Sequence, residues 1–98
     1  MTINKKLDGS KLTMALKGRL DTVTAPELEA ELKGALEGVT ELVFDMEELE
    51  YLSSAGLRVL LSAQKQMNKQ GSMVVTKANE TILEIFEVTG FSDILTIQ

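Results

Sequence analysis

Short apolar runs of strand length alternate in this chain with amphipathic helical patterns, and this alternation limits the fold more than any other feature. Runs at 41–46 (ELVFDM) and 72–76 (SMVVT) are separated by a helical pattern at 55–71, and a weaker strand pattern lies at 93–97. Strand-helix-strand units of this spacing favour parallel neighbours joined by right-handed crossovers. We therefore expect an α/β fold, a mixed β-sheet of about four to five strands with helices packed on it, in the order β β α β α β α β.

The two strands that open the chain are predicted to pair as an antiparallel hairpin. The residues DGS at 8–10 lie between two extended runs, and Asp-Gly is a strong turn signal because both residues tolerate positive φ. At 11–17, Leu12, Met14 and Leu16 alternate with polar or small residues. This period of two predicts one buried and one solvated face.

Three helices are predicted. The first covers 24–38 (TAPELEAELKGALEG), where Thr24 and Glu27 have the spacing of a capping box. The second follows at 55–71 and ends at a glycine, and the third covers 79–90, from Asn79 to another glycine. Apolar stripes on each helix indicate the faces that pack against the sheet.

A polar connection, EELEY at 47–51, is predicted between the run at 41–46 and the second helix. In this interpretation Asp45 closes an apolar strand, as Asp21 closes the second strand, so both carboxylates could point at the start of the second helix. The acidic cluster that begins at Asp45 matches no calcium-loop pattern and is typical of a solvated turn.

Composition excludes several classes of function. Fifteen acidic residues against ten basic ones give a formal net charge of −5, which disfavours nucleic acid, whose phosphates are bound by clustered Lys and Arg. The chain has no Cys and no His, so a Ser-His-Asp triad and a cysteine metal site are excluded, and it has no phosphate-binding GxxxxGK[ST] loop. We expect no metal, no cofactor and no enzymatic activity.

At 98 residues the chain is expected to form one domain, 1–98. Its N-terminal segment lacks the continuous apolar run of a signal peptide, and no stretch approaches 18 apolar residues. We therefore expect a cytoplasmic protein with no membrane partner.

Two adjacent serines, Ser53 and Ser54, precede the second helix in YLSSAGLRVLL at 51–61. A hydroxyl here is typical of an N-cap, and Gly56 serves close packing or turn geometry. The segment is not a nucleophile elbow, since no glycine stands two residues upstream, and no base is apparent that would make Ser54 a catalytic nucleophile. From the residues alone, a structural cap is the simpler interpretation.

Five segments occur along the chain in a characteristic order: LKGRLD at 16–21, TAPELEAEL at 24–32, ELVFDM at 41–46, YLSSAGLRVLL at 51–61 and IFEVTGFSDIL at 85–95. Together they resemble the STAS-domain family of bacterial anti-sigma-factor antagonists. The resemblance spans nearly the whole chain, and the combination is far more specific than any of its parts.

The resemblance also assigns site residues. The family carries Asp-Ser-Ser/Thr/x-Gly-Leu before its second helix, and its phosphorylated serine stands two residues before the glycine. This spacing implies phosphorylation at Ser54, with Ser53, where many members carry aspartate, as an alternative acceptor. The residues implied near the phosphorylation site and in partner binding are Asp21, Thr22, Asp45, Ser53, Ala55, Gly56 and Leu57.

The function that the resemblance implies is partner switching. The unmodified protein binds an anti-sigma factor that has a histidine-kinase-like ATPase domain, and sigma factor is released. Phosphorylation by that kinase prevents the binding, and a serine phosphatase resets it. The alternative within the same fold is an accessory subunit of a transport ATPase or a signalling scaffold, neither of which needs a phosphorylatable serine. An exposed docking surface also leaves room for a weak homodimer.

Overall fold

The computed structural model describes residues 1–98 and contains the predicted elements in the predicted order. The strands are β1 (Thr2–Asp8), β2 (Lys11–Leu20), β3 (Glu41–Leu52), β4 (Ser72–Thr76) and β5 (Thr96–Ile97), and the helices are α1 (Ala25–Leu32), α2 (Ser54–Gln70), α3 (Glu80–Val88) and the 3₁₀ helix η1 (Phe91–Asp93). The sheet order is β1-β2-β3-β4-β5, with β1 antiparallel to β2 and all other neighbours parallel. The expected α/β fold is therefore confirmed.

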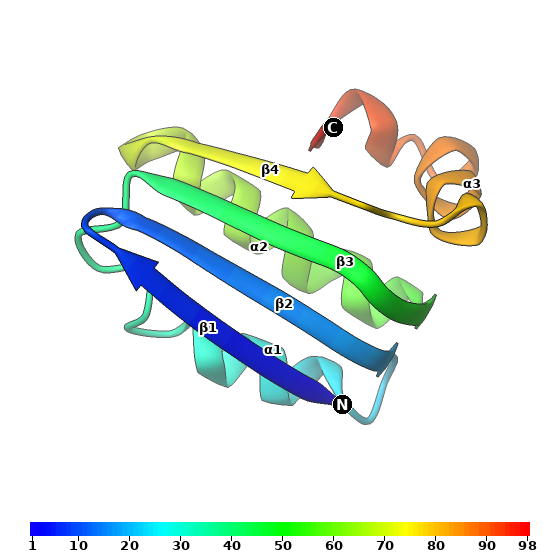
Figure 1. Ribbon diagram of the computed structural model, residues 1–98. Coiled ribbons are helices and arrows are strands. Elements are labelled where there is room, and N and C mark those ends of the chain that lie inside the picture. The colour runs from blue at the N-terminus through cyan, green and yellow to red at the C-terminus, as the bar shows by residue number, and fades with distance from the viewer.

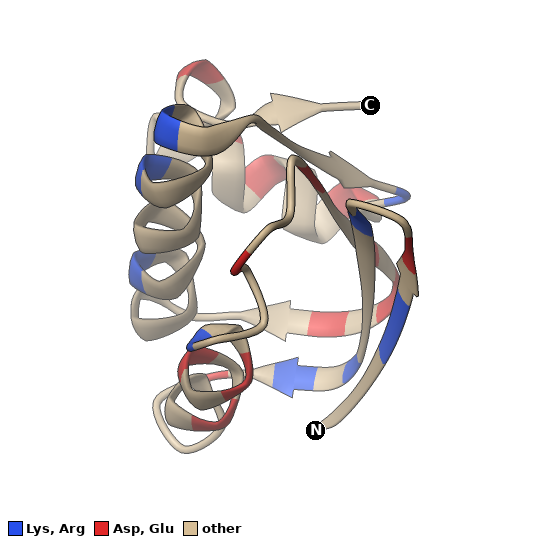
Figure 2. Cartoon of the chain, turned by 90° about the vertical axis from the view of Figure 1, so that its left-hand side faces the viewer, with Lys and Arg blue, Asp and Glu red and all other residues tan.

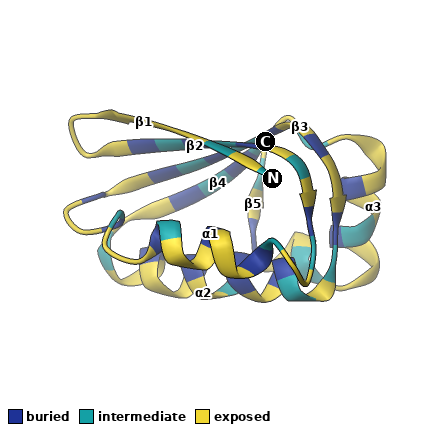
Figure 3. Cartoon of the chain, turned by 90° about the horizontal axis from the view of Figure 1, so that it is seen from below, coloured by how far each residue is buried: buried dark blue, intermediate teal, exposed yellow.

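The helices cover one face of the sheet. Figures 1 and 3 show α1 and α2 side by side against that face and α3 near the end of the strands, while the opposite face carries no helix. The central strand β3 shows the consequence, because Leu42 and Phe44 are buried under the helices whereas Val43, on the other face, is only half-buried. No helix has the combination of length and apolar character that crossing a membrane requires.

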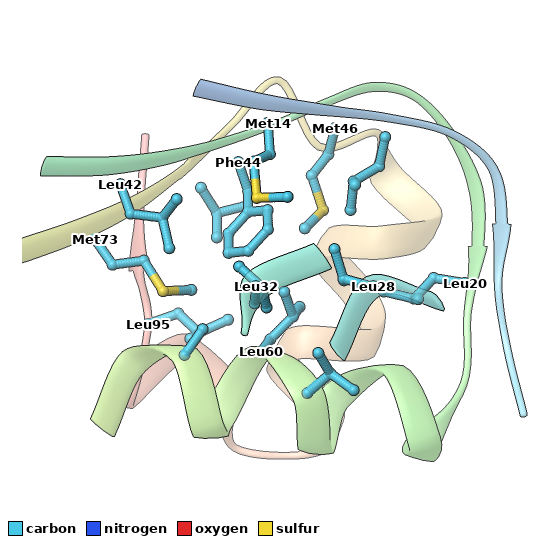
Figure 4. Packing of buried hydrophobic residues seen from close by; sticks show 14 of the residues in the cluster. Met14, Leu20, Leu28, Leu32, Leu42, Phe44, Met46, Leu60, Met73 and Leu95 are labelled. Atoms are coloured by element: carbon cyan, nitrogen blue, oxygen red, sulfur yellow. The ribbon is translucent and has the colours of Figure 1, made fainter. Parts of the chain in front are cut away.

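The core lies between the sheet and α1 and α2 (Figure 4). Leu12, Met14 and Leu16 of β2 point into it, as their alternation predicts, and Phe44 of β3 and Leu60 of α2 are fully buried there. In all, 24 buried apolar residues form one cluster. Since burial of a large apolar side chain contributes about 1.5–3 kcal/mol, this cluster is the main source of stability.

The hairpin and the start of α3 form as predicted. Asp8 pairs with Lys11 across the turn, and Gly9 has a φ of 62°, in the left-handed region that glycine occupies without strain. The Asn79 side chain accepts a hydrogen bond from the Ile82 amide at 2.9 Å and so caps α3. The strand predicted at 93–97 forms only over Thr96–Ile97 as β5, because Asp93 belongs to η1.

The first helix begins where predicted, after Thr24 as its N-cap residue, but it ends earlier than predicted and lacks the expected capping hydrogen bond. It ends at Leu32, since the backbone of Lys33 is extended, and the chain then turns through Gly34, which has a φ of 86°. Leu36 still reaches the core from this turn. The capping box is wrong: the Thr24 hydroxyl makes no cap hydrogen bond and instead bonds backwards, accepting from the Asp21 amide and donating to the Arg19 carbonyl oxygen.

The third strand is longer than predicted. Residues 47–51, expected as a polar connection, belong to β3, and Asp45 lies inside the strand, opposite Ala15 of β2 and Thr76 of β4. The prediction that Asp45 closes the strand is therefore wrong. The buried positions explain the error, since Met46, Leu49 and Leu52 are three residues apart where register shifts interrupt the pairing with β2. Such irregularities hide a strand from a search for period two.

Gly71 ends α2 by close packing. A Cβ atom at this position would lie 1.9 Å from the Thr40 carbonyl oxygen, which accepts a hydrogen bond from the Ser72 amide. The contact brings the end of α2 against the residue that precedes β3. Any side chain would therefore force the backbone apart where β3 and β4 begin.

We predict that Gly71→Ala destabilises the protein by about 2 kcal/mol, because the added methyl group meets backbone that cannot move without breaking pairing between β3 and β4. Urea unfolding measures the change. Ser72→Ala is the matched control, since the Ser72 side chain is exposed. Equal unfolding midpoints for the two variants would contradict the packing argument.

Candidate functional site

The candidate site forms where β2 and β3 end. Both strands continue past β4, which pairs only with residues 41–45 of β3, and Figure 1 shows the far end of β3 curving away from the sheet. β2 leads into a loop at 21–24, and β3 leads through Ser53 into α2. The Ser53 amide donates a hydrogen bond to the Leu20 carbonyl oxygen at 2.9 Å. This bond ties the loop and the start of α2 together.

The two serines have different roles in the structure. Ser53 is the N-cap of α2, with extended backbone, and its hydroxyl oxygen accepts a long hydrogen bond of 3.5 Å from the Gly56 amide. Ser54 is the first residue of the helix and is exposed, and its hydroxyl takes part in none of the side-chain hydrogen bonds. The predicted cap is therefore Ser53, while the Ser54 hydroxyl is exposed and unpaired.

The Asp21 carboxylate organises the loop at 21–24. Its Oδ1 accepts hydrogen bonds from the Val23 amide at 3.0 Å and the Thr24 amide at 3.1 Å. The Asp21 carbonyl oxygen accepts a further bond from the Ala25 amide, in the first turn of α1. Asp21 thus fixes the entry to α1 beside the start of α2.

These contacts also hold the pKa of Asp21 below its ordinary value of 3.8. The Thr24 amide has the largest effect, the Val23 amide and the Thr24 hydroxyl add to it, and the Arg19 guanidinium contributes by its charge, while desolvation works in the opposite direction. Asp21 is therefore a carboxylate at neutral pH. Its negative charge is a fixed feature of the surface near Ser54.

Arg19 of β2 is held from two sides. Its Nε lies 3.7 Å from Asp21 Oδ2, and its guanidinium lies over the Tyr51 ring at 4.3 Å from the ring centroid. Arg19 and Tyr51 are partners in the pairing of β2 with β3. The guanidinium is consequently engaged both by a carboxylate and by a ring face.

Gly56 and Leu57 support the site from within. A Cβ atom on Gly56 would lie 2.7 Å from Leu20 Cγ and 2.8 Å from Leu52 Cδ1, so close packing, and not a turn, requires glycine there. Leu57 is a core residue, only 5% exposed. Both residues are buried and set the position of α2 on the strands.

Thr22 and Ala55 lie on the outer surface. They line a shallow depression between α1 and α2 together with Pro26, Glu29, Arg58 and Ser62. The structure therefore brings together Asp21, Thr22, Ser53, Ser54 and Ala55 around the start of α2.

Asp45 belongs to another part of the surface. It lies seven residues before the end of β3, its Oδ1 accepts a hydrogen bond from the Glu47 amide at 3.0 Å, and its Oδ2 lies 3.9 Å from Lys77 Nζ. The expectation that Asp45 points at the start of α2 rested on the wrong strand end. No three acidic side chains gather closely enough to hold a metal ion.

Val23 and Arg58, two exposed residues near the site, carry no prediction from the sequence, which for Tyr51 leaves a partner-facing role and a core or rim position open. Val23 in the loop is 81% exposed, Tyr51 at the end of β3 is 37% exposed, and Arg58 lies one helical turn after Ser54. The spacing of Arg58 from Ser54 could have identified it. The exposure of Val23 and the stacking of Tyr51 depend on the loop and on an irregular strand register, which no local pattern reveals.

Comparison with known proteins identifies a family and several relatives of the chain. Residues 2–98 match the STAS domain. The putative anti-sigma factor antagonist BtrV of Bordetella bronchiseptica is 38% identical over 94 residues, which cover 94% of this chain and 80% of BtrV. The anti-sigma-B factor antagonist of Listeria monocytogenes is 31% identical, with 96% of this chain and 84% of that protein covered.

Solved structures share the fold. An anti-sigma factor antagonist from Mycobacterium paratuberculosis matches with a TM-score of 0.88 and 23% identity, over 98% of this chain and 83% of that one. The Bacillus cell fate determinant SpoIIAA in its phosphorylated form matches with a TM-score of 0.77 and 17% identity, over 99% of this chain and 91% of that one. At these identities the likeness is one of fold.

We predict that Gly56→Ala destabilises the protein by about 1–3 kcal/mol, because the methyl group overpacks the contact with Leu20 and Leu52. Chemical unfolding gives the value. Ser54→Ala is the control on the same helix turn and should unfold at the wild-type midpoint. An unfolding midpoint of Gly56→Ala equal to that of wild type would show that Leu20 and Leu52 accommodate the methyl group without loss of stability.

A second prediction concerns acid stability. Because the pKa of Asp21 is lowered by folding, its charge stabilises the folded state above the ordinary pKa of 3.8, and this contribution is lost as the pH falls through the lowered value. Wild type should therefore be more stable than Asp21→Asn at neutral pH, and the difference should shrink in acid. Unfolding at a series of pH values tests this, with Asp8→Asn as a control for net charge. A difference that persists unchanged in acid would refute it.

Proposed function

The chain belongs to the STAS-domain family, and we propose that it is an anti-sigma-factor antagonist whose partner binding is controlled by phosphorylation of Ser54. In the unmodified state it binds an anti-sigma factor and so frees the sigma factor. In the phosphorylated state it does not bind. The observation that carries this proposal is the exposed Ser54 hydroxyl, free of hydrogen bonds, at the first position of α2.

Ser54 is the better acceptor of the two serines. Ser53 is half-buried, and its amide donates a hydrogen bond to the Leu20 carbonyl oxygen. Its hydroxyl oxygen caps the helix, so phosphorylation of this oxygen would break the capping hydrogen bond. Ser54 loses no hydrogen bond when it is modified. It also lies beside the depression between α1 and α2, on the surface that a partner would contact.

The chemistry is supplied by the partner. The γ-phosphoryl group of ATP passes to Ser54 Oγ, the serine proton goes to a base of the kinase, and ADP leaves. A histidine-kinase-like ATPase domain in the anti-sigma factor fits this role, and a serine phosphatase returns Ser54 to its hydroxyl form by hydrolysis. The protein itself acts as a binding module, for which we propose a cytoplasmic location.

The phosphate acts on the interface and leaves the fold intact. A phosphoserine brings about −1.5 to −2 charges, and at the first position of a helix these face unpaired N–H groups and the positive end of the helix dipole. α2 has no acidic residue in its first turn to oppose them. Asp21 adds a nearby negative charge, which favours a phosphate that points outward towards the partner.

We predict that Ser54→Ala binds the anti-sigma factor normally but is not phosphorylated, and that Ser54→Asp binds at least tenfold more weakly with unchanged helical circular dichroism. The reason is that the added charge repels the partner while helix α2 tolerates it. Phosphorylation is measured with ATP and a purified anti-sigma factor that has a histidine-kinase-like ATPase domain, and binding to the same protein by calorimetry. Ser53→Ala is the matched control for the site of phosphorylation, because it keeps the Ser54 hydroxyl and should still be phosphorylated.

Three outcomes would overturn the proposal. Phosphate on Ser53 would place the switch at the cap, and an unmodified wild-type protein would favour the accessory-subunit role. A large loss of helical signal in Ser54→Asp would mean that the charge acts by unfolding α2.

A further inference from the structure

The charges of the three helices are segregated. α2 carries Arg58, Lys65 and Lys69 and no acidic residue, whereas α1 and α3 each carry three glutamates and no basic residue. Figure 2 shows the cations as separate bands along α2 and the acidic residues on the other helices. In a chain with a net charge of −5, the helix that begins at Ser54 is thus a basic element.

Arg58 is the cation of this helix that lies closest in sequence to Ser54, and it has no partner. The chain contains five ion pairs and Arg58 takes part in none of them. On its own helix, the neighbours three and four residues away are serine, alanine and leucine. Glu29 of α1 lines the same depression but forms no ion pair with Arg58.

We propose that Arg58 is the internal counter-ion of phosphorylated Ser54: the guanidinium pairs with the phosphate one helical turn away. This inference rests on the proposed function for its relevance, since it concerns the state that follows phosphorylation. It assigns to Arg58 a positioning role in the switch.

The geometry of the helix supports the pairing. Residues four apart on an α-helix are neighbours on its surface, and both Ser54 and Arg58 are exposed. Helical side chains lean towards the N-terminus, which puts Ser54 within the reach of a side chain at position 58. An anion that precedes a cation by four residues is also the more favourable order, because it agrees with the helix dipole.

The other cation near the start of α2 is already engaged. Arg19 is paired with Asp21 and stacked on Tyr51, so it is committed before phosphorylation. Arg58 is the free guanidinium, and its planar set of donors can bind two phosphate oxygens at once. Pairing with Arg58 would draw the phosphate along α2, away from the Asp21 carboxylate.

The pairing changes what a partner meets at this surface. The unmodified protein presents a free Arg58 guanidinium next to a neutral hydroxyl. The phosphorylated protein presents an anion, and its guanidinium is no longer available. One covalent change therefore adds a negative group and withdraws a positive one.

The test uses protein with phosphoserine placed at position 54 during synthesis, so that no kinase is needed. The ³¹P chemical shift is followed through the second ionisation of the phosphate, whose pKa is ordinarily about 6. A neighbouring guanidinium favours the dianion, so Arg58→Gln should lower the acid dissociation constant of this step by roughly twofold or more. Arg58→Lys keeps the charge and should restore most of the wild-type value.

Lys65→Gln is the matched control. It removes the same charge from an exposed position on the same helix, eleven residues from Ser54, and should leave the titration unchanged. Identical titrations for wild type and Arg58→Gln, or an equal shift for Lys65→Gln, would overturn the proposal. Because the phosphate is built in, these results do not depend on whether a kinase modifies Ser54, and the two proposals can fail separately.

Discussion

One backbone hydrogen bond, from the Ser53 amide to the Leu20 carbonyl oxygen, holds the functional end of this protein together. It joins the end of β2 to the junction of β3 and α2, two segments more than thirty residues apart in the chain. The bond is made where the regular pairing of β2 with β3 ends, at Leu20 and Leu52. Gly56 then packs on these two leucines, so the position of α2, and of Ser54 with it, depends on the same contact.

The parts of the fold that follow local rules could be predicted from the sequence. The hairpin turn is determined by Gly9, the start of α3 by Asn79, and the buried face of β2 by alternation within 11–16. In each case the predictive pattern lies within a few residues. It reflects a local requirement: a positive φ in the turn, a hydrogen-bond acceptor at the helix start, or apolar side chains facing the core. The order of strands and helices then follows from these elements and the right-handed crossover rule.

What escaped prediction depends on contacts between distant segments. β3 continues to Leu52 because β2 supplies a partner along its whole length, and the register shifts break the period that would reveal it. Asp45 was consequently misplaced, and with it one expected member of the site. The loop at 21–24 was misread for a similar reason: the Thr24 hydroxyl bonds to the Arg19 carbonyl oxygen, and Asp21, not Thr24, satisfies the free amides before α1.

The two serines at the start of α2 have separate roles: Ser53 caps the helix, and Ser54 is the proposed site of phosphorylation. The first turn of α2 needs an acceptor at the N-cap, and Ser and Asp are both strong N-cap residues. Ser53 therefore fills the structural role that the resemblance gives to aspartate, without its charge. A phosphate on Ser54 then has one like charge fewer beside it, and the remaining charged neighbours differ in availability: Asp21 is paired with Arg19, whereas Arg58 is free. Serine in place of aspartate at position 53 therefore keeps the N-cap of α2. It also removes a negative charge that would repel a phosphate on Ser54.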